Sequence, residues 1–165
     1  MTKVSQLVIL FVVVVICFMS YVYCDDFHVV GQIYCDTCRA GFETEISEPI
    51  KGAKVGLECR NKEGGNITYT ADDVVTDEDG MYSVVINGDH EDDVCEVLLK
   101  ESPRSDCNEV VPTRNQGRVS LINNSDIDSP IRFMNSLAFL KKEPLFNCSK
   151  VIANLSLTPD DITVL

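Results

Sequence analysis

Two cysteines three positions apart are the residues whose type and spacing most readily suggest chemistry. They form a Cys-Asp-Thr-Cys motif at residues 35–38. A redox-active pair needs a thiol of low pKa at a helix N-terminus, whereas Cys35 follows a strand-like segment and Arg39 opens a polar loop. Residues three apart on an extended strand face opposite sides, so Cys35 and Cys38 are expected to have different partners. Structural disulfides are the favoured interpretation, and a thiol oxidoreductase using Cys35 and Cys38 is the alternative.

Metal-binding patterns are weaker. A zinc site would need further Cys or His residues at matching spacing, and the chain has only His28 and His90 and no second Cys-X-X-Cys motif. The Asp-Glu-Asp-Gly run at residues 77–80 resembles part of a calcium loop, but it leads straight into a strand-like segment. We interpret it as a hairpin turn, and we expect neither a metal nor a cofactor.

No arrangement of catalytic residues stands out in the sequence. There is no Gly-X-Ser-X-Gly motif, and two histidines leave few ways to activate a serine. Carboxylates are so numerous that a close pair would carry no information about glycoside hydrolysis. Trp is absent, which removes the best signal for a carbohydrate-stacking platform. We therefore expect a non-enzymatic protein with no catalytic residues.

The first 24 residues are typical of a secretory signal peptide. Lys3 precedes an apolar run over residues 7–19, and Val22 and Cys24 lie three and one positions before the expected cleavage point. An uncleaved signal-anchor helix is the alternative, because the apolar stretch approaches the length that spans a membrane. Cleavage leaves one domain over residues 25–165, about 140 residues, in which the residues after Cys148 form a tail.

The cysteine count and the charge describe the domain further. Six cysteines remain after cleavage, at positions 35, 38, 59, 95, 107 and 148. In an oxidising compartment this even set predicts three disulfides, for which the sequence alone allows fifteen pairings. The formal net charge of −12 gives no electrostatic footprint for nucleic acid or anionic lipid.

N-glycosylation sequons mark candidate surface positions in the secreted part. Asn66 and Asn123 lie in turn-like surroundings, and Asn154 is a further candidate. Asn147 is doubtful, because Cys148 occupies the middle of its sequon and is expected to be paired.

Apolar residues recur with the period of two that is typical of strands. In residues 53–59, the side chains at 53, 55, 57 and 59 share one face, opposite Lys54, Gly56 and Glu58. Further strands are expected at residues 27–35, 81–86, 94–99 and 118–122, and weaker ones at 67–71 and 74–76. Residues 137–142 fit a short helical turn or a strand. Gly-, Asn- and Asp-rich turns separate these runs, so we expect an antiparallel all-β sandwich or barrel.

Residues 31–39, Gly-Gln-Ile-Tyr-Cys-Asp-Thr-Cys-Arg, resemble the N-terminal signature of the pollen Ole e 1-like family of plant extracellular proteins, with Ile33 in place of Val. Residues 50–55 with Cys59, residues 76–82, and residues 135–144 ahead of Cys148 are similar to further segments of that family. The resemblance covers nearly all of the mature chain, and the six cysteines correspond in order.

The resemblance implies a compact β-barrel or sandwich of about seven strands, secreted into the apoplast or cell wall. It also implies the disulfides Cys35–Cys107, Cys38–Cys148 and Cys59–Cys95. Family members occur in pollen and other tissues, some are allergens, and one relative is associated with receptor-kinase binding. We therefore expect a secreted interaction protein, a ligand or co-ligand of a plant cell-surface receptor. A wall-associated protein that binds polysaccharide is the structural alternative.

Overall fold

A computed structural model describes residues 26–111, 114–122 and 129–155 of the chain. The expected signal peptide and Asn123 lie outside these residues. The described strands are β1 (Asp26–Asp36), β2 (Glu48–Pro49), β3 (Lys54–Asn61), β4 (Ile67–Val75), β5 (Met81–Asn87), β6 (Asp93–Glu101), β7 (Cys107–Glu109), β8 (Gln116–Val119), β9 (Ile131–Phe133) and β10 (Leu137–Lys141); the helix α2 (Cys148–Asn154) follows. Within the described ranges, no helix has the length and apolar character needed to cross a membrane.

Strand β1 is the centre of the first sheet. Its N-terminal half pairs antiparallel with β5 and parallel with β9. Its C-terminal half pairs antiparallel with β2 and parallel with β10, which in turn pairs with β7. Because β9 and β10 both run parallel to β1, the late part of the chain returns to lie beside the first strand.

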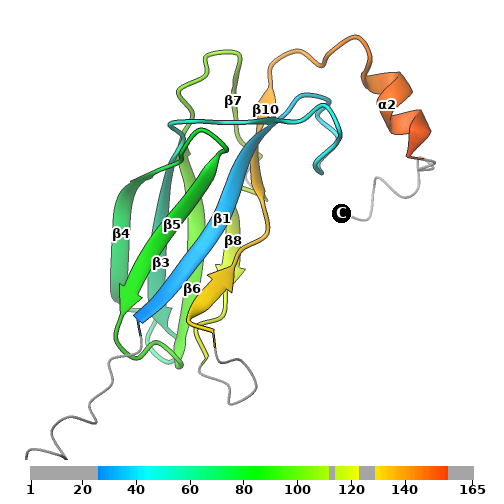
Figure 1. The fold of residues 1–165 in the computed structure, drawn as a ribbon. Helices are drawn as coiled ribbons and strands as arrows, with labels where there is room; N and C mark the ends of the chain where they lie inside the picture. Colours follow the sequence, from blue (N-terminus) through cyan, green and yellow to red (C-terminus); the bar gives the residue numbers. More distant parts are fainter. Residues whose placement is uncertain (1–25, 112–113, 123–128, 156–165) are drawn as a thin grey trace, which may run out of the picture.

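The second sheet has the order β4-β3-β6-β8 and packs against the first (Figure 1). All three of its pairings are antiparallel. Within the described residues β8 pairs with β6 alone, so the two sheets do not close into a barrel. The all-β prediction is confirmed, and of its two forms the molecule takes the sandwich. The expectation of antiparallel pairing holds throughout the second sheet but not in the first, where β9 and β10 run parallel to β1.

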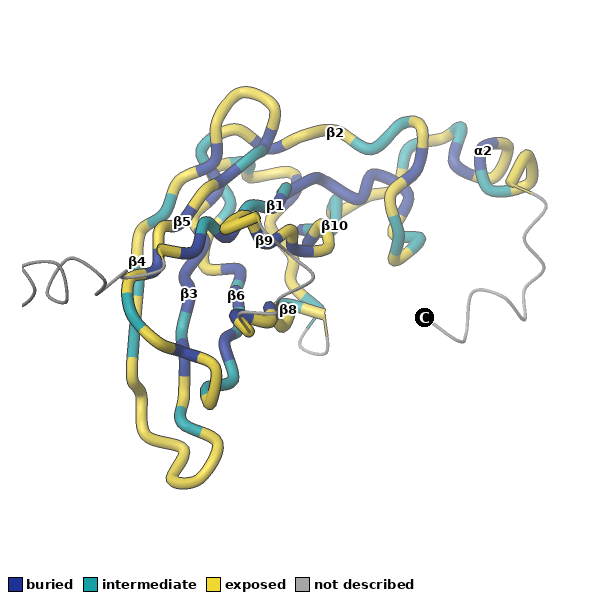
Figure 2. The backbone as a smooth tube through the Cα atoms, turned by 60° about the horizontal axis from the view of Figure 1, so that its bottom comes forward, coloured by how far each residue is buried: buried dark blue, intermediate teal, exposed yellow. Residues whose placement is uncertain are grey.

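The core lies between the two sheets and is built by the expected alternation. Ala53, Val55, Leu57 and Cys59 are at most 1% exposed. The buried residues Tyr82, Val84 and Ile86 of β5 also belong to the core cluster, as predicted for residues 81–86. Figure 2 shows the buried positions along β1, β3 and β6, while β4 is mostly exposed.

Several predicted elements differ in extent from those in the structure. Residues 67–71 and the first two residues of 74–76 belong to one strand, β4, which ends at Val75 and whose register with β3 shifts between Val55 and Leu57. Asp73 has a φ of +62° there, which interrupts the alternation and explains why the sequence reads as two pieces. Residues 137–141 form the strand β10, which settles that ambiguity. The short helix α2 was not predicted, and it lies outside the sheets (Figure 1).

Candidate interaction cavity

The Cys-Asp-Thr-Cys motif spans the end of β1 and the turn that follows it. Cys35 lies in β1 and bonds to Cys107, whereas Cys38 lies in the turn and bonds to Cys148 at the start of α2. Cys59 bonds to Cys95, its register partner across β3 and β6. These are the pairs that the family resemblance implies. The two cysteines of the motif do have different partners, but the reason is the turn rather than an extended strand.

The disulfide arrangement bears directly on redox chemistry. Cys35 and Cys107 are fully buried, and Cys38 and Cys148 are 7% and 6% exposed. Each sulfur of the motif is bonded to a distant residue, so Cys35 and Cys38 do not form the disulfide with each other that a dithiol oxidoreductase requires. In the described ranges, no group of three or more His, Cys, Asp or Glu side chains is placed to hold a metal ion.

The two residues between these cysteines hold the turn in shape. The buried Asp36 carboxylate accepts hydrogen bonds from the backbone N–H groups of Cys38, Ala40 and Gly41, at 3.2, 3.1 and 2.7 Å. The Thr37 hydroxyl donates to the carbonyl oxygen of Ile46 at 2.9 Å. Hydrogen bonds from backbone N–H groups to a carboxylate are charge-assisted and therefore strong. The two polar residues of the motif thus stabilise the conformation of the loop through these hydrogen bonds.

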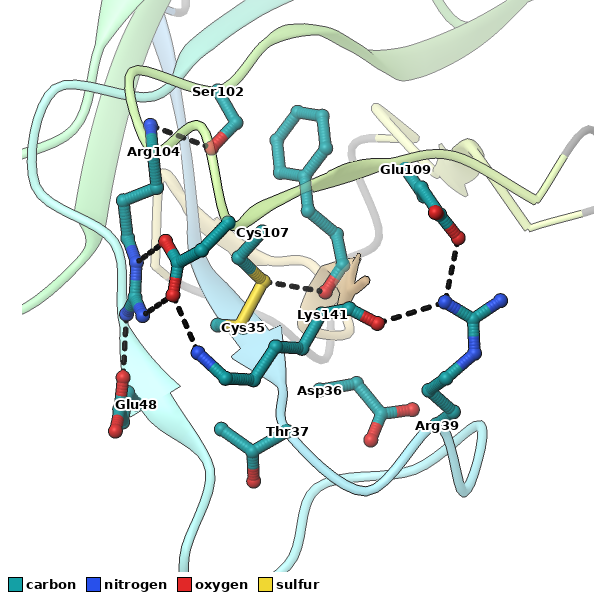
Figure 3. Close-up of a disulfide and its surroundings, with 12 residues drawn as sticks. Cys35, Asp36, Thr37, Arg39, Glu48, Ser102, Arg104, Cys107, Glu109 and Lys141 are labelled. Carbon is teal, nitrogen blue, oxygen red and sulfur yellow. Dashed lines mark hydrogen bonds and ion pairs between the residues drawn. A yellow bond between two sulfur atoms is a disulfide. The ribbon is translucent and has the colours of Figure 1, made fainter. Parts of the chain in front are cut away.

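Two arginine networks flank the Cys35–Cys107 bridge (Figure 3). On one side, Arg39 donates to Glu109 at 2.5 Å and to the carbonyl oxygen of Lys141 at 2.7 Å.

On the other side, Arg104 pairs with Glu48 and Asp106, and the Nζ of Lys141 also contacts Asp106. The hydrogen bond from Arg104, followed by that from Lys141, holds the pKa of Asp106 well below its usual range. Lys141 joins the two networks, because its carbonyl oxygen accepts a hydrogen bond from Arg39 and its ammonium group pairs with Asp106.

The acidic run at residues 77–80 is a turn, but the prediction of a hairpin turn is wrong, because the run joins β4 of the second sheet to β5 of the first and these two strands do not pair. The Asp77 side chain accepts hydrogen bonds from the backbone N–H groups of Asp79 and Met81 at 3.0 and 2.9 Å. Gly80 has a φ of +72°, and a Cβ there would lie 2.4 Å from the carbonyl oxygen of Ile33. Both the backbone conformation and the close approach to β1 therefore require glycine.

A second polar cluster lies around the β5–β6 connection, at the end of the sandwich opposite the motif (Figure 1). Asp93 accepts a hydrogen bond from the Thr68 hydroxyl at 2.6 Å, and its carboxylate lies 2.8 Å from Nδ1 of His90. The hydrogen bond from Thr68 contributes most to lowering the pKa of Asp93, and His90 lowers it further.

A cavity of about 520 Å³ lies against the outer face of the β1–β10 pair. Tyr34 and Asp36 of β1 are in register with Ala138 and Leu140 of β10, and all four line it. Their sequence neighbours point the other way, into the core: Ile33, Cys35, Leu137 and Phe139. Of these four, Leu137 also reaches the cavity wall.

Two loops form the walls of this cavity. Residues 39–41 supply one, and the connection between β7 and β8 supplies the other through Val111 and Arg114. Arg114 donates from Nη1 to the carbonyl oxygen of Gly41 at 3.0 Å, which ties the two walls together. The remaining lining residues are Gln116, Gly117, Asn135 and Ser136.

The cavity brings together the two ends of the family resemblance. Tyr34, Asp36 and Arg39 come from residues 31–39, and Asn135, Ser136, Leu137, Ala138 and Leu140 come from residues 135–144. Core packing and disulfides explain many residues of these segments, but Asn135 and Ser136 are exposed. Within the described part of the chain, their side chains form no hydrogen bonds. Sequence reasoning missed this site because its residues come from separate segments that only the β1–β10 pairing joins.

Charged groups of both signs lie in and around the cavity. Its lining holds two arginines and one carboxylate, in a protein of formal net charge −12. Burial, followed by the negative charges of Asp36 and Glu43, raises the pKa of Tyr34 to about 12. The phenol is therefore neutral at physiological pH.

The sequons occupy different parts of the molecule. Asn66 is exposed in the connection between β3 and β4, and Asn154 is the exposed last residue of α2. Asn147 directly precedes α2, where its carbonyl oxygen accepts hydrogen bonds from the N–H groups of Lys150 and Val151.

Comparisons with known proteins agree on one family. The family model described as "Pollen protein Ole e 1 like" matches residues 25–156. An "Olee1-like protein" of Betula pendula is 44% identical over 154 residues, which cover 89% of this chain and 92% of that protein. The "Anther-specific protein LAT52" of Solanum lycopersicum is 39% identical, with coverage of 94% and 97%.

An allergen and a solved structure extend the comparison. The "Pollen allergen Che a 1" of Chenopodium album is 48% identical, with coverage of 81% of this chain and 80% of that protein. The crystal structure of the major plantain pollen allergen Pla l 1 superposes with a TM-score of 0.64 at 33% identity, covering 73% of this chain and 97% of the other.

Proposed function

Because this chain belongs to the Pollen protein Ole e 1 like family, we propose that it is a secreted, non-enzymatic interaction protein that a plant cell-surface receptor binds as a ligand or co-ligand. The names of its relatives, among them pollen allergens and an anther-specific protein, support a role in pollen. The three disulfides support a location in the apoplast or cell wall, because such bridges persist in oxidising compartments.

The cavity is the observation that carries the proposal. It is concave, and its volume falls in the range typical of binding sites. Asn135 and Ser136 add hydrogen-bonding groups that neither the core nor the disulfides require. Exposed polar residues are ordinary on a protein surface, but these two lie on a loop that borders a concave site, where loops commonly carry binding residues.

An enzymatic role for the motif cysteines is disfavoured. Cys35 and Cys38 contribute to two separate bridges between distant parts of the chain, and both bridges are buried. A catalytic thiol must be accessible to its substrate. This arrangement supports scaffold roles for both cysteines.

Binding of wall polysaccharide is the alternative function. Tyr34 is the aromatic residue of the cavity lining, and it is only 5% exposed, so it offers little open ring face to a sugar. Stacking on an aromatic face is a common basis of sugar recognition. The cavity therefore supports a protein partner better than a glycan.

Processing of the secreted chain is part of the proposal. Residues 1–24 are removed as a signal peptide, the mature N-terminus is Asp25 or lies close to it, and sugar is attached at Asn66 or Asn123, with Asn154 a further acceptor. Intact mass before and after glycosidase treatment tests this. A product that retains residues 1–24 in the membrane pellet would favour the signal anchor.

A pull-down from plant membranes tests the proposed function. The baits are the glycosylated wild type, Ser136→Arg at the cavity, and Ser83→Arg as a matched control on exposed β5 surface. We expect wild type and Ser83→Arg to retain a receptor ectodomain and Ser136→Arg to lose it. Retention only on isolated wall glycans would overturn the receptor proposal in favour of the polysaccharide alternative.

A further inference from the structure

We propose that residues 162–165 of this chain, Ile-Thr-Val-Leu, bind in the cavity on the β1–β10 pair, from which a partner protein would have to displace them. These residues lie outside the described part of the chain and follow the family match, which ends at residue 156. The inference rests on the proposed function in one respect, because it adds a regulation of the same site.

The charged groups of the cavity lining are already engaged within the chain. Arg39 pairs with Glu109, and Arg114 donates to a backbone carbonyl group of the opposite wall. The carboxylate of Asp36 accepts three backbone hydrogen bonds, and its negative charge acts on Tyr34 in the same lining. A charged occupant would have to break these interactions to gain a counter-ion, so the cavity favours an uncharged one.

The floor of the cavity is apolar. Val111, Ala138 and Leu140 line it and are each partly buried. Ala138 is in register with Tyr34, so a small side chain stands beside a large one and leaves space above the β1–β10 pair. An apolar side chain placed there would remove these surfaces from water. Residues 162–165 supply three apolar side chains and no charged side chain.

The helix α2 begins close to the cavity. Its first residue, Cys148, is bonded to Cys38 with a Cα–Cα distance of 5.3 Å, and Cys38 directly precedes Arg39 of the cavity wall. Figure 1 shows α2 beyond that end of the β1–β10 pair. A helix rises about 1.5 Å per residue, so the Cα atom of Leu155 lies at most about 20 Å from that of Arg39.

The chain after α2 is long enough to reach the cavity. The ten residues 156–165 follow Leu155 and extend to about 33 Å. About 13 Å of this length remains at the cavity wall even when α2 points directly away from it, which is the length of about four residues. Residues 162–165 therefore reach the cavity for any direction of the helix. Asp160 and Asp161 lie in the spanning part and need not enter.

Covalent attachment favours this occupant over a separate protein with similar side chains. A segment joined to its site by a short connection has an effective concentration on the order of millimolar. A free partner that makes the same apolar contacts would need a comparable concentration to compete. A receptor would therefore have to displace the segment by adding contacts outside the cavity.

Nuclear magnetic resonance of the full disulfide-bonded chain tests the inference. The double variant Ile162→Asp with Val164→Asp introduces charges into the segment. Thr158→Asp is the matched control, because it introduces a charge into the spanning part alone. We expect the amide signals of Gly41 and Ala138 to shift in the double variant and to stay unchanged in the control.

A cavity variant tests the same contact from the other side. Ala138→Leu fills the space beside Tyr34, so the amide signals of residues 162–165 should move to the positions of an unbound peptide. Ser83→Leu, on the exposed surface of β5, is the matched control and should leave these signals unchanged. Circular dichroism and thermal unfolding identify a cavity variant that fails to fold. In that case the variants at 158, 162 and 164 decide, because they leave the described residues unaltered.

The possible results separate this inference from the proposed function. Lining signals that coincide in wild type and in the double variant would overturn the inference. Shifts that grow with protein concentration, together with a dimer in size-exclusion chromatography, would assign the cavity to the segment of a second copy and overturn the contact within one chain. These measurements involve no receptor, so a failed pull-down rejects the proposed function alone.

The regulation has its own readout. If the segment blocks the cavity, the double variant should capture the receptor at least about threefold more strongly than wild type, because the binding-competent fraction of the protein rises. Equal capture by the two proteins would overturn the regulation.

Discussion

Tyr82 packs so tightly against Gly31 that a Cβ at position 31 would lie 2.3 Å from the tyrosine hydroxyl oxygen. Both residues belong to segments of the family resemblance, and β1 and β5 place them opposite each other in register. The ring covers the backbone of β1 where a side chain would otherwise stand. Glycine is thus required here by the close approach of its neighbour.

Gly31→Ala should lower the free energy of unfolding by about 1–3 kcal/mol, because the added methyl group overpacks the core against the Tyr82 ring. Urea denaturation followed by tyrosine fluorescence measures the change. Gly64→Ala is the control, since its Cβ would meet only the flexible amide of Asn66 at 3.2 Å, and it should stay within about 0.5 kcal/mol of wild type. Equal stabilities of the two variants would contradict the close packing.

Tyr82→Phe should preserve or raise the free energy of unfolding, by up to about 1 kcal/mol. The Tyr82 hydroxyl is buried and has no hydrogen-bond partner among the described residues, and burial raises its pKa to about 12. Removing it eliminates a desolvation cost without breaking a hydrogen bond. Urea denaturation at neutral pH tests this, and a loss of more than about 1 kcal/mol would reveal an unrecognised partner of the hydroxyl.

Asp36→Asn should lower the free energy of unfolding by at least about 2 kcal/mol. The substitution removes the charge and replaces one of the two acceptor oxygens with an NH2 group, which cannot accept a hydrogen bond from the N–H groups of Cys38, Ala40 or Gly41. Hydrogen exchange of the Ala40 and Gly41 amides should accelerate along with the loss of stability. Asp92→Asn, at an exposed position, is the control. Unchanged hydrogen-exchange rates at both amides would contradict the role of Asp36 in stabilising this turn.

The Asp93 cluster should make stability depend on pH in the acid range. A carboxyl whose pKa is lower in the folded than in the unfolded state binds fewer protons when folded, so its contribution is present above the unfolded pKa, about 3.9. That contribution is lost as the pH falls through the lower folded pKa. Asp93→Asn should therefore flatten the stability profile below about pH 4.

Thr68→Val separates the causes of this shift, because the Thr68 hydroxyl contributes most to it. The variant should reduce the acid-dependent loss while leaving the His90 contact in place. Since Thr68 completes the Asn66 sequon, all proteins in this comparison should be unglycosylated. Profiles of wild type and Asp93→Asn that coincide down to pH 2 would contradict the shift.

Removing the Cys38–Cys148 bridge should destabilise the domain by about 2–4 kcal/mol, because the bridge closes a loop between residues 110 positions apart. The double variant Cys38→Ser with Cys148→Ser avoids leaving an unpaired thiol that could form wrong pairs. Thermal unfolding measures the loss. Non-reducing peptide mapping of wild type is the companion experiment, and a peptide linked internally through Cys35 and Cys38 would contradict the bridges described above.

Local patterns could be predicted from the sequence, and contacts between distant segments could not. The alternation in residues 53–59 and in residues 81–86 identified core strands, because a strand with one buried face has apolar residues at every second position of its own sequence. The parallel pairing of β1 with β9 and β10 could not be predicted from such a pattern, since parallel and antiparallel partners require apolar residues at the same positions. The strands β2, β7 and β9 have two or three residues, too few to show a period.

The cavity was beyond prediction for the same reason. Tyr34 and Ala138 read as ordinary strand positions, and only their register across β1 and β10 shows that a small residue leaves space beside a large one. Arg114 enters the site through the β7–β8 connection, which has no periodic pattern. The family resemblance supplied the disulfide pairs and the secreted location as expectations, but it identified no binding residues.

The pairing of β1 with β10 has a consequence for biosynthesis. The first strand to leave the ribosome is the central strand of its sheet, yet two of its neighbours, β9 and β10, are among the last segments to be made. The disulfide of Cys38 likewise cannot form until Cys148 has been synthesised. Until then, β1 has an open edge and Cys38 carries an unpaired thiol, a state prone to aggregation and mispairing. The nascent chain is therefore exposed to aggregation and mispairing until residue 148 has emerged from the ribosome.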